Sequence, residues 1–113
     1  MPIAEPEPIV RIANTIIMEA RRKSASEIKL DFLPAESVTS YLIAGIWHEE
    51  MRVPGYINPP LIERFRTMAD LEGQLSSAKE EGMIPIRCDN KDYLLGLTHT
   101  RTDSGEQMLI RFM

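Results

Sequence analysis

Two histidines and their acidic neighbours are the first candidates for chemistry in this sequence. His48 is followed by Glu49 and Glu50, but a zinc-hydrolase motif also needs a second histidine on the same helix. The residues around His48 read as a strand instead, and His99 has no neighbours at metal-ligand spacing. We therefore expect His48 to lie on the surface of a strand, and we expect no metal site.

The thiol and the paired carboxylates also lack a catalytic arrangement. Cys88 precedes Asp89, whose negative charge disfavours the reactive thiolate. Glu49 and Glu50 are consecutive in an expected strand, so their side chains would point to opposite faces of a sheet. The sequence contains neither G-x-x-x-x-G-K-[ST] nor G-x-G-x-x-G. We therefore expect no catalytic residue, no cofactor and no enzyme activity.

Length and composition restrict the class of protein. The chain of 113 residues fits one domain, and 43% hydrophobic residues can form a core without disulfides. The net charge of −4 argues against a nucleic-acid partner. The first ten residues lack the pattern of a secretory signal, and no apolar run reaches membrane-spanning length. These features predict a cytoplasmic protein that does not insert into a membrane.

Residues 26–50 are the elements around which the expected fold is organised. Apolar and polar residues alternate over residues 27–32, which predicts a half-buried strand. A proline-containing break follows, and a second strand is expected over residues 38–43. A third strand is expected over residues 46–51, after a tight hairpin turn at Ala44-Gly45.

Amphipathic helices are predicted on both sides of these strands. The first begins at Pro8, carries an apolar stripe and ends at the basic residues 21–23. The second is expected to be capped by Asn58 and to end at Gly73, with its charged side chains, including Arg66, in solvent.

The remainder of the chain reads as a loop followed by hairpins. The loop is expected over residues 74–82, and further strands over residues 83–87, 93–98 and 108–112. The expected fold is therefore α+β, with two main helices and a mainly antiparallel sheet of about six strands in the order α-β-β-β-α-β-β-β. Residues 1–7 are expected to form a flexible arm, and residues 8–113 a single domain.

In the order of its elements and in several segments, the chain resembles the N-terminal, PAS-like domain that precedes the motor domain of type II secretion and type IV pilus assembly ATPases. The first helix of that family reads P-I-V-[RK]-L-V-N-x-I-L, and residues 8–17 here read PIVRIANTII. The second helix reads L-I-x-R-I-K-x-M-A-x-L, and residues 61–71 here read LIERFRTMADL. The resemblance runs from residue 8 to residue 113.

The departures from the family fall at the positions that the resemblance connects with nucleotide. Arginines of this domain in the family reach toward the nucleotide of the motor domain, where a guanidinium binds phosphate well. The corresponding positions here hold Ser40, Leu42 and Gly96. No Walker motif is present in these 113 residues. The pattern favours a stand-alone, non-catalytic relative.

The resemblance implies a role in protein–protein contacts. A secretion or pilus assembly ATPase, or a related component, is the expected partner, and self-association is a second expectation. The side chains expected at the partner surface are Arg64, Arg66, Arg101 and Trp47. Two alternatives stay open. The chain could be a PAS-like sensor of a small ligand, lined by Trp47, Tyr41 and Met51, or it could be a fragment of a full secretion ATPase.

Overall fold

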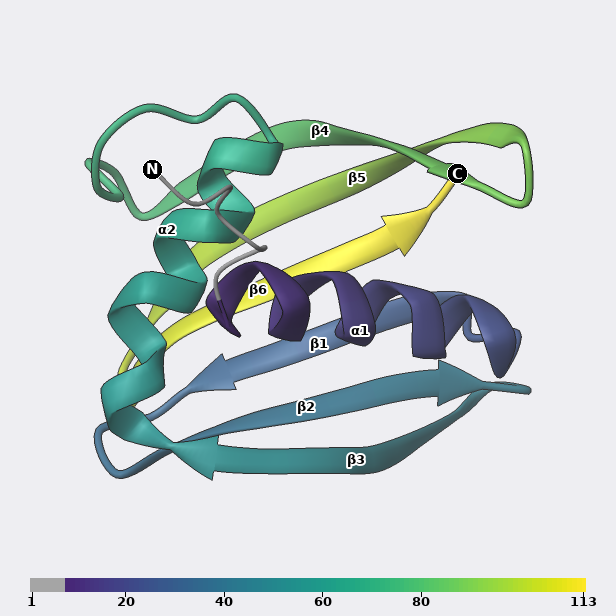
Figure 1. Cartoon of the computed structure of the whole chain (residues 1–113). Helices are drawn as coiled ribbons and strands as arrows, with labels where there is room; N and C mark the ends of the chain where they lie inside the picture. Colours follow the sequence, from purple (N-terminus) through teal and green to yellow (C-terminus); the bar gives the residue numbers. More distant parts are fainter. Residues whose placement is uncertain (1–7) are drawn as a thin grey trace, which may run out of the picture.

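The structure is a computed structural model that describes residues 8–113. These residues form a six-stranded antiparallel sheet with two α-helices on one of its faces (Figure 1). The expected arm over residues 1–7 lies outside the described residues. The fold class and the element order are confirmed. The elements are α1 (Pro8–Arg22), β1 (Glu27–Phe32), β2 (Glu36–Ile43), β3 (Ile46–Pro54), a 3-10 turn (Gly55–Ile57), α2 (Asn58–Met68), β4 (Lys79–Cys88), β5 (Lys91–Thr102) and β6 (Gly105–Phe112).

The sheet joins an N-terminal and a C-terminal set of three strands. Its strand order is β3-β2-β1-β6-β5-β4, so β1 and β6 lie at the centre and β3 and β4 at the edges. Ile28 pairs with Ile110 and Leu30 with Met108 across the central pair, and all four side chains are buried. The burial of these apolar pairs holds the two halves together.

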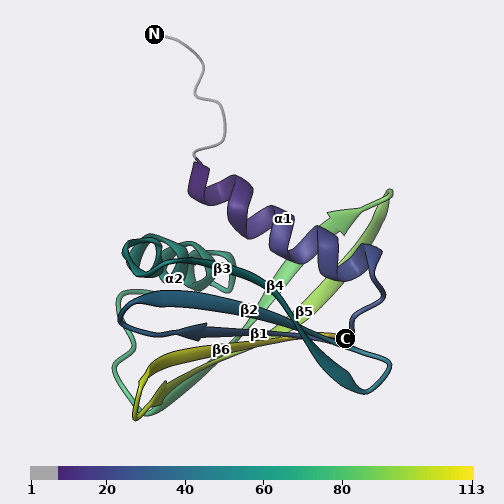
Figure 2. The ribbon, with the colours of Figure 1, turned by 90° about the horizontal axis from the view of Figure 1, so that it is seen from below.

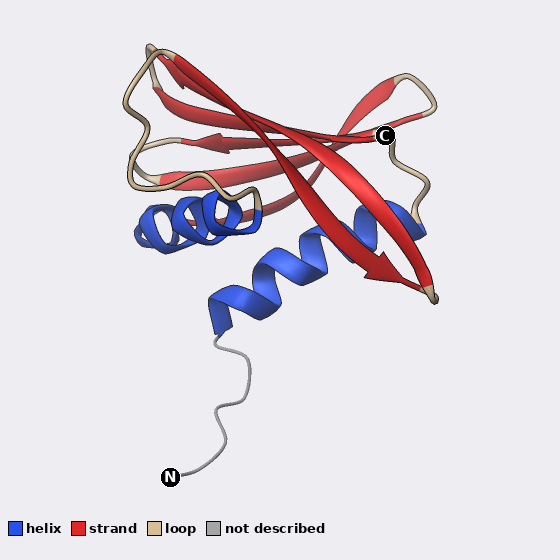
Figure 3. Cartoon of the chain, turned by 90° about the horizontal axis from the view of Figure 1, so that it is seen from above, coloured by secondary structure: helices blue, strands red, loops and turns tan. Residues whose placement is uncertain are grey.

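Both helices cover the same face of the sheet (Figures 2 and 3). The core lies between them and the sheet: Ile16 and Ile17 of α1 and Phe65 of α2 are almost completely buried. Tyr41 of β2 donates a hydrogen bond of 2.6 Å from its hydroxyl to the carbonyl oxygen of Ile16, which ties the sheet to α1. We call the opposite side of the sheet the helix-free face. Within residues 8–113, neither helix is long and apolar enough to cross a membrane.

The second helix differs from the sequence-based expectation at both ends. Its N-cap residue is Ile57, and the Asn58 side chain instead donates a hydrogen bond of 2.7 Å to the carbonyl oxygen of Leu33. The helix ends at Met68 rather than near Gly73, because Asp70 takes a left-handed conformation with φ 58°. The long-range bond of Asn58 therefore takes the place of the expected local cap.

The C-terminal strands are longer than expected. β4 begins at Lys79, inside the segment expected to be a loop, because its exposed polar residues hide the period of the strand. Gly82 of β4 allows α2 to approach closely, since a Cβ atom there would lie 2.8 Å from the carbonyl oxygen of Ala69. The turn at Ala44-Gly45 is confirmed as a tight hairpin, with φ of 51° and 79° at its two residues.

Candidate functional site

A cleft of about 760 Å³ runs along the outer side of α2. One wall is α2, with Ile62 and Thr67, and the opposite wall is the turn between β1 and β2, beginning at Phe32. The segment from Leu71 to Leu75 and the β5–β6 hairpin close the rest of the cleft. We call this site the α2 cleft. Its size lies in the range of binding sites in proteins, and both apolar and polar residues line it.

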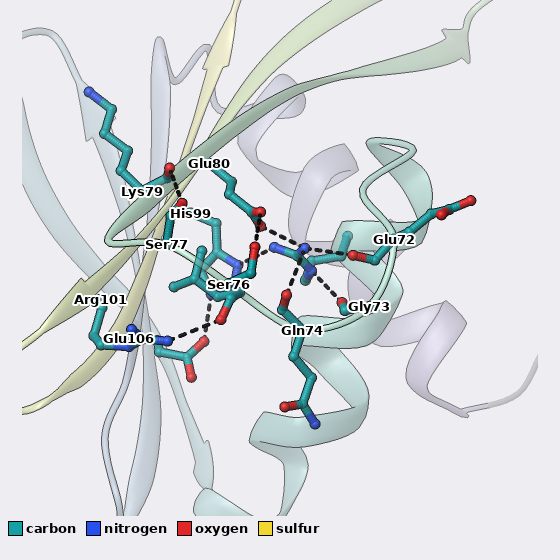
Figure 4. Close-up of polar contacts among 12 residues, drawn as sticks. Glu72, Gly73, Gln74, Ser76, Ser77, Lys79, Glu80, His99, Arg101 and Glu106 are labelled. Carbon is teal, nitrogen blue, oxygen red and sulfur yellow. Dashed lines mark hydrogen bonds and ion pairs between the residues drawn. The ribbon is translucent and has the colours of Figure 1, made fainter.

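The base of the α2 cleft is formed by a buried arginine. Arg66 is 2% exposed, and its Nε atom donates a hydrogen bond of 2.8 Å to the carbonyl oxygen of Gly73 (Figure 4). Its Nη2 atom donates to the carbonyl oxygen of Glu72 and lies 2.7 Å from Oε1 of Glu80. The expectation of a solvated Arg66 is therefore wrong. The chain turns back after α2, and its carbonyl groups converge on the guanidinium, which satisfies them.

The guanidinium of Arg66 also contacts the buried histidine of β5. His99 is 0% exposed, and its Nδ1 atom lies 2.9 Å from Nη1 of Arg66 (Figure 4). Its Nε2 atom lies 2.6 Å from Oε1 of Glu106 on β6. Because a guanidinium only donates, Nδ1 must accept, and the ring proton resides on Nε2 and is donated to Glu106.

The environment of His99 favours the neutral ring. Burial lowers the pKa of His99 below its ordinary value of 6.5, and the positive charge of Arg66 acts in the same direction. Glu106 and Glu80 act in the opposite direction without reversing the shift. The hydrogen bond from Arg66 in turn lowers the pKa of Glu80. His99 is therefore a neutral side chain that is held between the cation Arg66 and the anion Glu106.

The contacts of His99 engage both of its ring nitrogens. Both ring nitrogens of His99 are occupied by protein partners, so neither is available to move a substrate proton. Among residues 8–113, no group of three His, Cys, Asp or Glu side chains could hold a metal ion. The polar residues that line the cleft are Asn58, Glu63, Arg66, Thr67, Gln74, Arg101 and Glu106. They can orient a bound group, and the apolar walls can bury it.

The structure separates the four side chains expected at the partner surface. Arg66 and Arg101 both line the α2 cleft, and Arg101 donates a hydrogen bond of 3.0 Å to the carbonyl oxygen of Leu75. Arg64 is half-buried on α2 and is not part of the cleft lining. Trp47 lies on the helix-free face, with the Nζ atom of Lys29 4.5 Å from its ring centre. These four residues do not form one continuous surface.

The three residues expected to line a small-ligand pocket are also separated. Tyr41 is buried against α1, and burial raises its pKa to about 12. Met51 pairs with Thr39 and packs at the edge of the same core. Trp47 lies on the other face of the sheet, so no single cavity joins the three.

His99 and Glu106 are the site residues that sequence reasoning missed. The signal was the expected hairpin turn between them, because such a turn brings residues on either side of it together across two strands. Strand pairing places His99 opposite Met108 and Arg101 opposite Glu106, so His99 and Glu106 are diagonal neighbours on the helix-covered face. The contact of His99 with Arg66 carried no local signal.

The positions connected with nucleotide in the family resemblance all lie on the helix-free face. Leu42, Glu27, Arg111 and Gly96 form one row across β2, β1, β6 and β5. Ser40 lies in the adjacent row, opposite Lys29. The α2 cleft is on the helix-covered side, so it is separate from these positions.

Curated proteins of bacterial secretion and pilus systems match this chain, whereas no protein-family model does. Type II secretion system protein E of Pseudomonas aeruginosa is 24% identical over 106 residues, which is 94% of this chain and 21% of that protein. The type IV pilus assembly ATPase PilB of Myxococcus xanthus is 26% identical over 111 residues, which is 97% of this chain and 20% of PilB. Protein E of Xanthomonas campestris is 24% identical over 98% of this chain and 20% of its own length. The chain therefore spans about a fifth of the length of these relatives. Over almost all of its residues, it is similar to an N-terminal domain of type II secretion protein E and of pilus assembly ATPases.

Proposed function

We propose that this protein is a non-catalytic accessory or regulatory binding protein of a type II secretion or type IV pilus system. Its partner is an assembly ATPase or a related component in the cytoplasm, and the α2 cleft is the contact site. The observation that carries this proposal is the cleft itself, whose apolar walls enclose polar groups that are already held in place. The similarity to protein E and PilB supports the choice of system.

The shape of the α2 cleft fits a protruding segment of a partner protein. Ile62 and Pro34 offer apolar surface on facing walls, which suits an apolar side chain of the partner. Arg101 and Glu106 are direct neighbours on β5 and β6, so the same end of the cleft presents both a cation and an anion. Such a pair can fix the position of a polar segment of the partner protein in the cleft. Because the two charges are opposite, the cleft does not select for partners of one net charge.

The buried network supports a binding role by making the cleft rigid. Arg66 connects the end of α2 with residues 72–74, His99 and Glu80, so the floor of the cleft is fixed by bonds to three elements. A preformed site loses less conformational entropy when a partner binds.

Binding of the assembly ATPase from the same organism tests this proposal directly. Thr67 is exposed on α2 and lines the cleft, so Thr67→Arg should block the cleft without disturbing the core. We expect Thr67→Arg to weaken binding at least about tenfold in biolayer interferometry, which corresponds to about 1.4 kcal/mol. Arg22→Glu on α1, where the side chain is 66% exposed, is the matched control and should bind like the wild type. Equal affinity of Thr67→Arg and the wild type would show that the cleft is not the contact.

Sensing of a small ligand in the same cleft is a second candidate function. The volume of about 760 Å³ lies within the range of small-molecule sites. Among residues 8–113, the Oδ1 atom of Asn58 is buried without a hydrogen-bond partner, and a small movement of this cleft-lining side chain would present Oδ1 to a ligand donor. Ligand-observed NMR with a fragment library would test this idea. Hits that bind the wild type and not Thr67→Arg would support it, and the absence of hits would count against it.

A further inference from the structure

The helix-free face carries a four-cornered patch around β5. Strand pairing places Glu81 and Met83 of β4 on one side of β5, and Leu109 and Arg111 of β6 on the other. These side chains point away from the helices, because Leu97, which lies between their rows on β5, is buried in the core. By the spacing of strands and residues, the corners outline a rectangle of roughly 10 by 7 Å.

The middle of this patch is hollow and its rim is apolar. Gly96 has no side chain, and the Sδ atom of Met113 lies 3.6 Å from where a Cβ atom of Gly96 would be; a depression of about 310 Å³ is lined by Gly96, Met83 and Met113. Met83 is 40% exposed, Leu94 46% and Met113 74%, although all three are large apolar residues. Large apolar side chains therefore gather around this depression and stay exposed to solvent.

The charged corners of the patch are available for a partner. The side chain of Glu81 is 68% exposed and lies 4.0 Å from Lys79. The side chain of Arg111 is 60% exposed and lies 4.0 Å from Glu27. Both distances are at the outer limit of an ion pair, so neither charge is tightly neutralised within the chain. Each could form a shorter pair with a group above the sheet.

The pattern of the four corners is complementary to itself. Met83 and Leu109 occupy one diagonal, and Glu81 and Arg111 the other. A two-fold axis along the apolar diagonal, in the plane of the contact, brings each charged corner to within roughly 4 Å of the position of the other. It places Glu81 of each chain against Arg111 of the partner subunit, and it brings Met83 and Leu109 close to their own copies.

We propose that two copies of this chain pair face to face through this patch. The occupant of the hollow at Gly96 is the apolar rim of the second copy, and the two equivalent Glu81–Arg111 ion pairs fix the angle between the sheets. The helix-covered side stays outside the contact, so the α2 cleft is open in both copies. This inference goes beyond the proposed function, because it holds whether or not an assembly ATPase is the partner.

A charge-swap experiment on the full chain tests the pairing. Sedimentation velocity over a concentration series should show a monomer–dimer equilibrium for the wild type. Glu81→Arg and Arg111→Glu should each raise the dimer dissociation constant at least about tenfold, because each creates two like-charge contacts per dimer. The double variant restores opposite charges and should return the dissociation constant to within about threefold of the wild type.

Matched charge reversals on the helices provide the control. Glu63→Arg on α2 and Arg22→Glu on α1 change the same charges on exposed positions outside the patch, and both should dimerise like the wild type. Leu94→Lys provides a further variant at a 46% exposed position and should also weaken the dimer. A wild-type chain that stays monomeric at about 0.5 mM would overturn the proposal, since a specific homodimer is expected to form below that concentration. A double variant no better than either single one would overturn it as well.

Discussion

Arg66 on α2 donates a hydrogen bond of 2.9 Å to Nδ1 of His99 on β5, although the two residues lie 33 positions apart in the chain. This contact holds His99 in the neutral form with its proton on Nε2, where Glu106 accepts it. A second proton would have to enter at Nδ1, where it would face the donor group of Arg66. The protonation of His99 and the packing of α2 on the sheet are therefore linked.

The first prediction concerns pH. The pKa of His99 is lowered from 6.5 in the folded chain, chiefly by burial, so the unfolded chain takes up a proton at a higher pH than the folded chain does. The free energy of unfolding should therefore fall as the pH drops below about 6.5, and this decline should end below the pKa of folded His99. Glu80, whose pKa is lowered from 4.5, contributes its own loss only at lower pH.

Urea unfolding between about pH 8 and pH 5 measures this decline, a window that spans the ordinary histidine pKa. His99→Gln should be less stable overall but should lose most of the pH dependence in this range. His48 is exposed on β3, so His48→Gln should keep the wild-type profile. A wild-type stability that stays flat across this range would contradict the assignment of a neutral, buried His99.

The second prediction concerns the buried arginine. Arg66→Met removes the charge that faces Glu80 and leaves carbonyl groups of residues 72–74 without their donor. The free energy of unfolding should decrease by about 3–5 kcal/mol, the usual cost of removing one partner from a buried ionic network. Arg22→Met, at an exposed ion pair with Glu19, should cost less than about 0.5 kcal/mol in the same denaturation experiment. A similar small loss at Arg66 would mean that water replaces its contacts.

The third prediction concerns the hydrophobic core. Ile16 and Phe65 are 1% and 0% exposed, as their apolar stripes indicated. Ile16→Ala and Phe65→Ala should each lower the free energy of unfolding by about 2–5 kcal/mol, because each leaves a cavity. Met18 lies on the exposed side of α1, and Met18→Ala is the control that should have a much smaller effect. Chemical denaturation showing less than about 0.5 kcal/mol at either core site would contradict the packing described here.

The fourth prediction concerns nucleotide. Ser40, Leu42 and Gly96 lie on the helix-free face, at the positions where the family resemblance places arginines that reach toward nucleotide. A charge-assisted contact from each such arginine to phosphate would be worth about 1.5–3 kcal/mol, and this chain lacks all three. We therefore expect no binding of Mg-ATP tighter than about 1 mM, equivalent to about −4 kcal/mol. Calorimetric titration checks this expectation. A saturable site in the micromolar range would show that other residues bind phosphate.

The parts of the fold with a strong local pattern were predictable. The alternation from Glu27 to Phe32 gives β1 with the expected bounds, and Pro8 begins α1 as expected. Local patterns failed where a distant partner decides the outcome. Arg66 reads as a surface residue on the helix, because only the folded chain brings carbonyl groups and His99 around it. Asn58 reads as a helix cap, but it is the first residue of α2 itself, and its side-chain amide donates to the carbonyl oxygen of Leu33.

The most direct test of the binding account is an NMR titration of the labelled chain with the purified assembly ATPase of the same organism. Binding through the α2 cleft predicts saturable shifts concentrated at Ile62, Thr67, Leu71 and Arg101, and their loss in Thr67→Arg. Saturable binding whose shifts leave these residues unchanged, or no binding at about 0.1 mM of both proteins, an affinity weaker than about −5 kcal/mol, would contradict it.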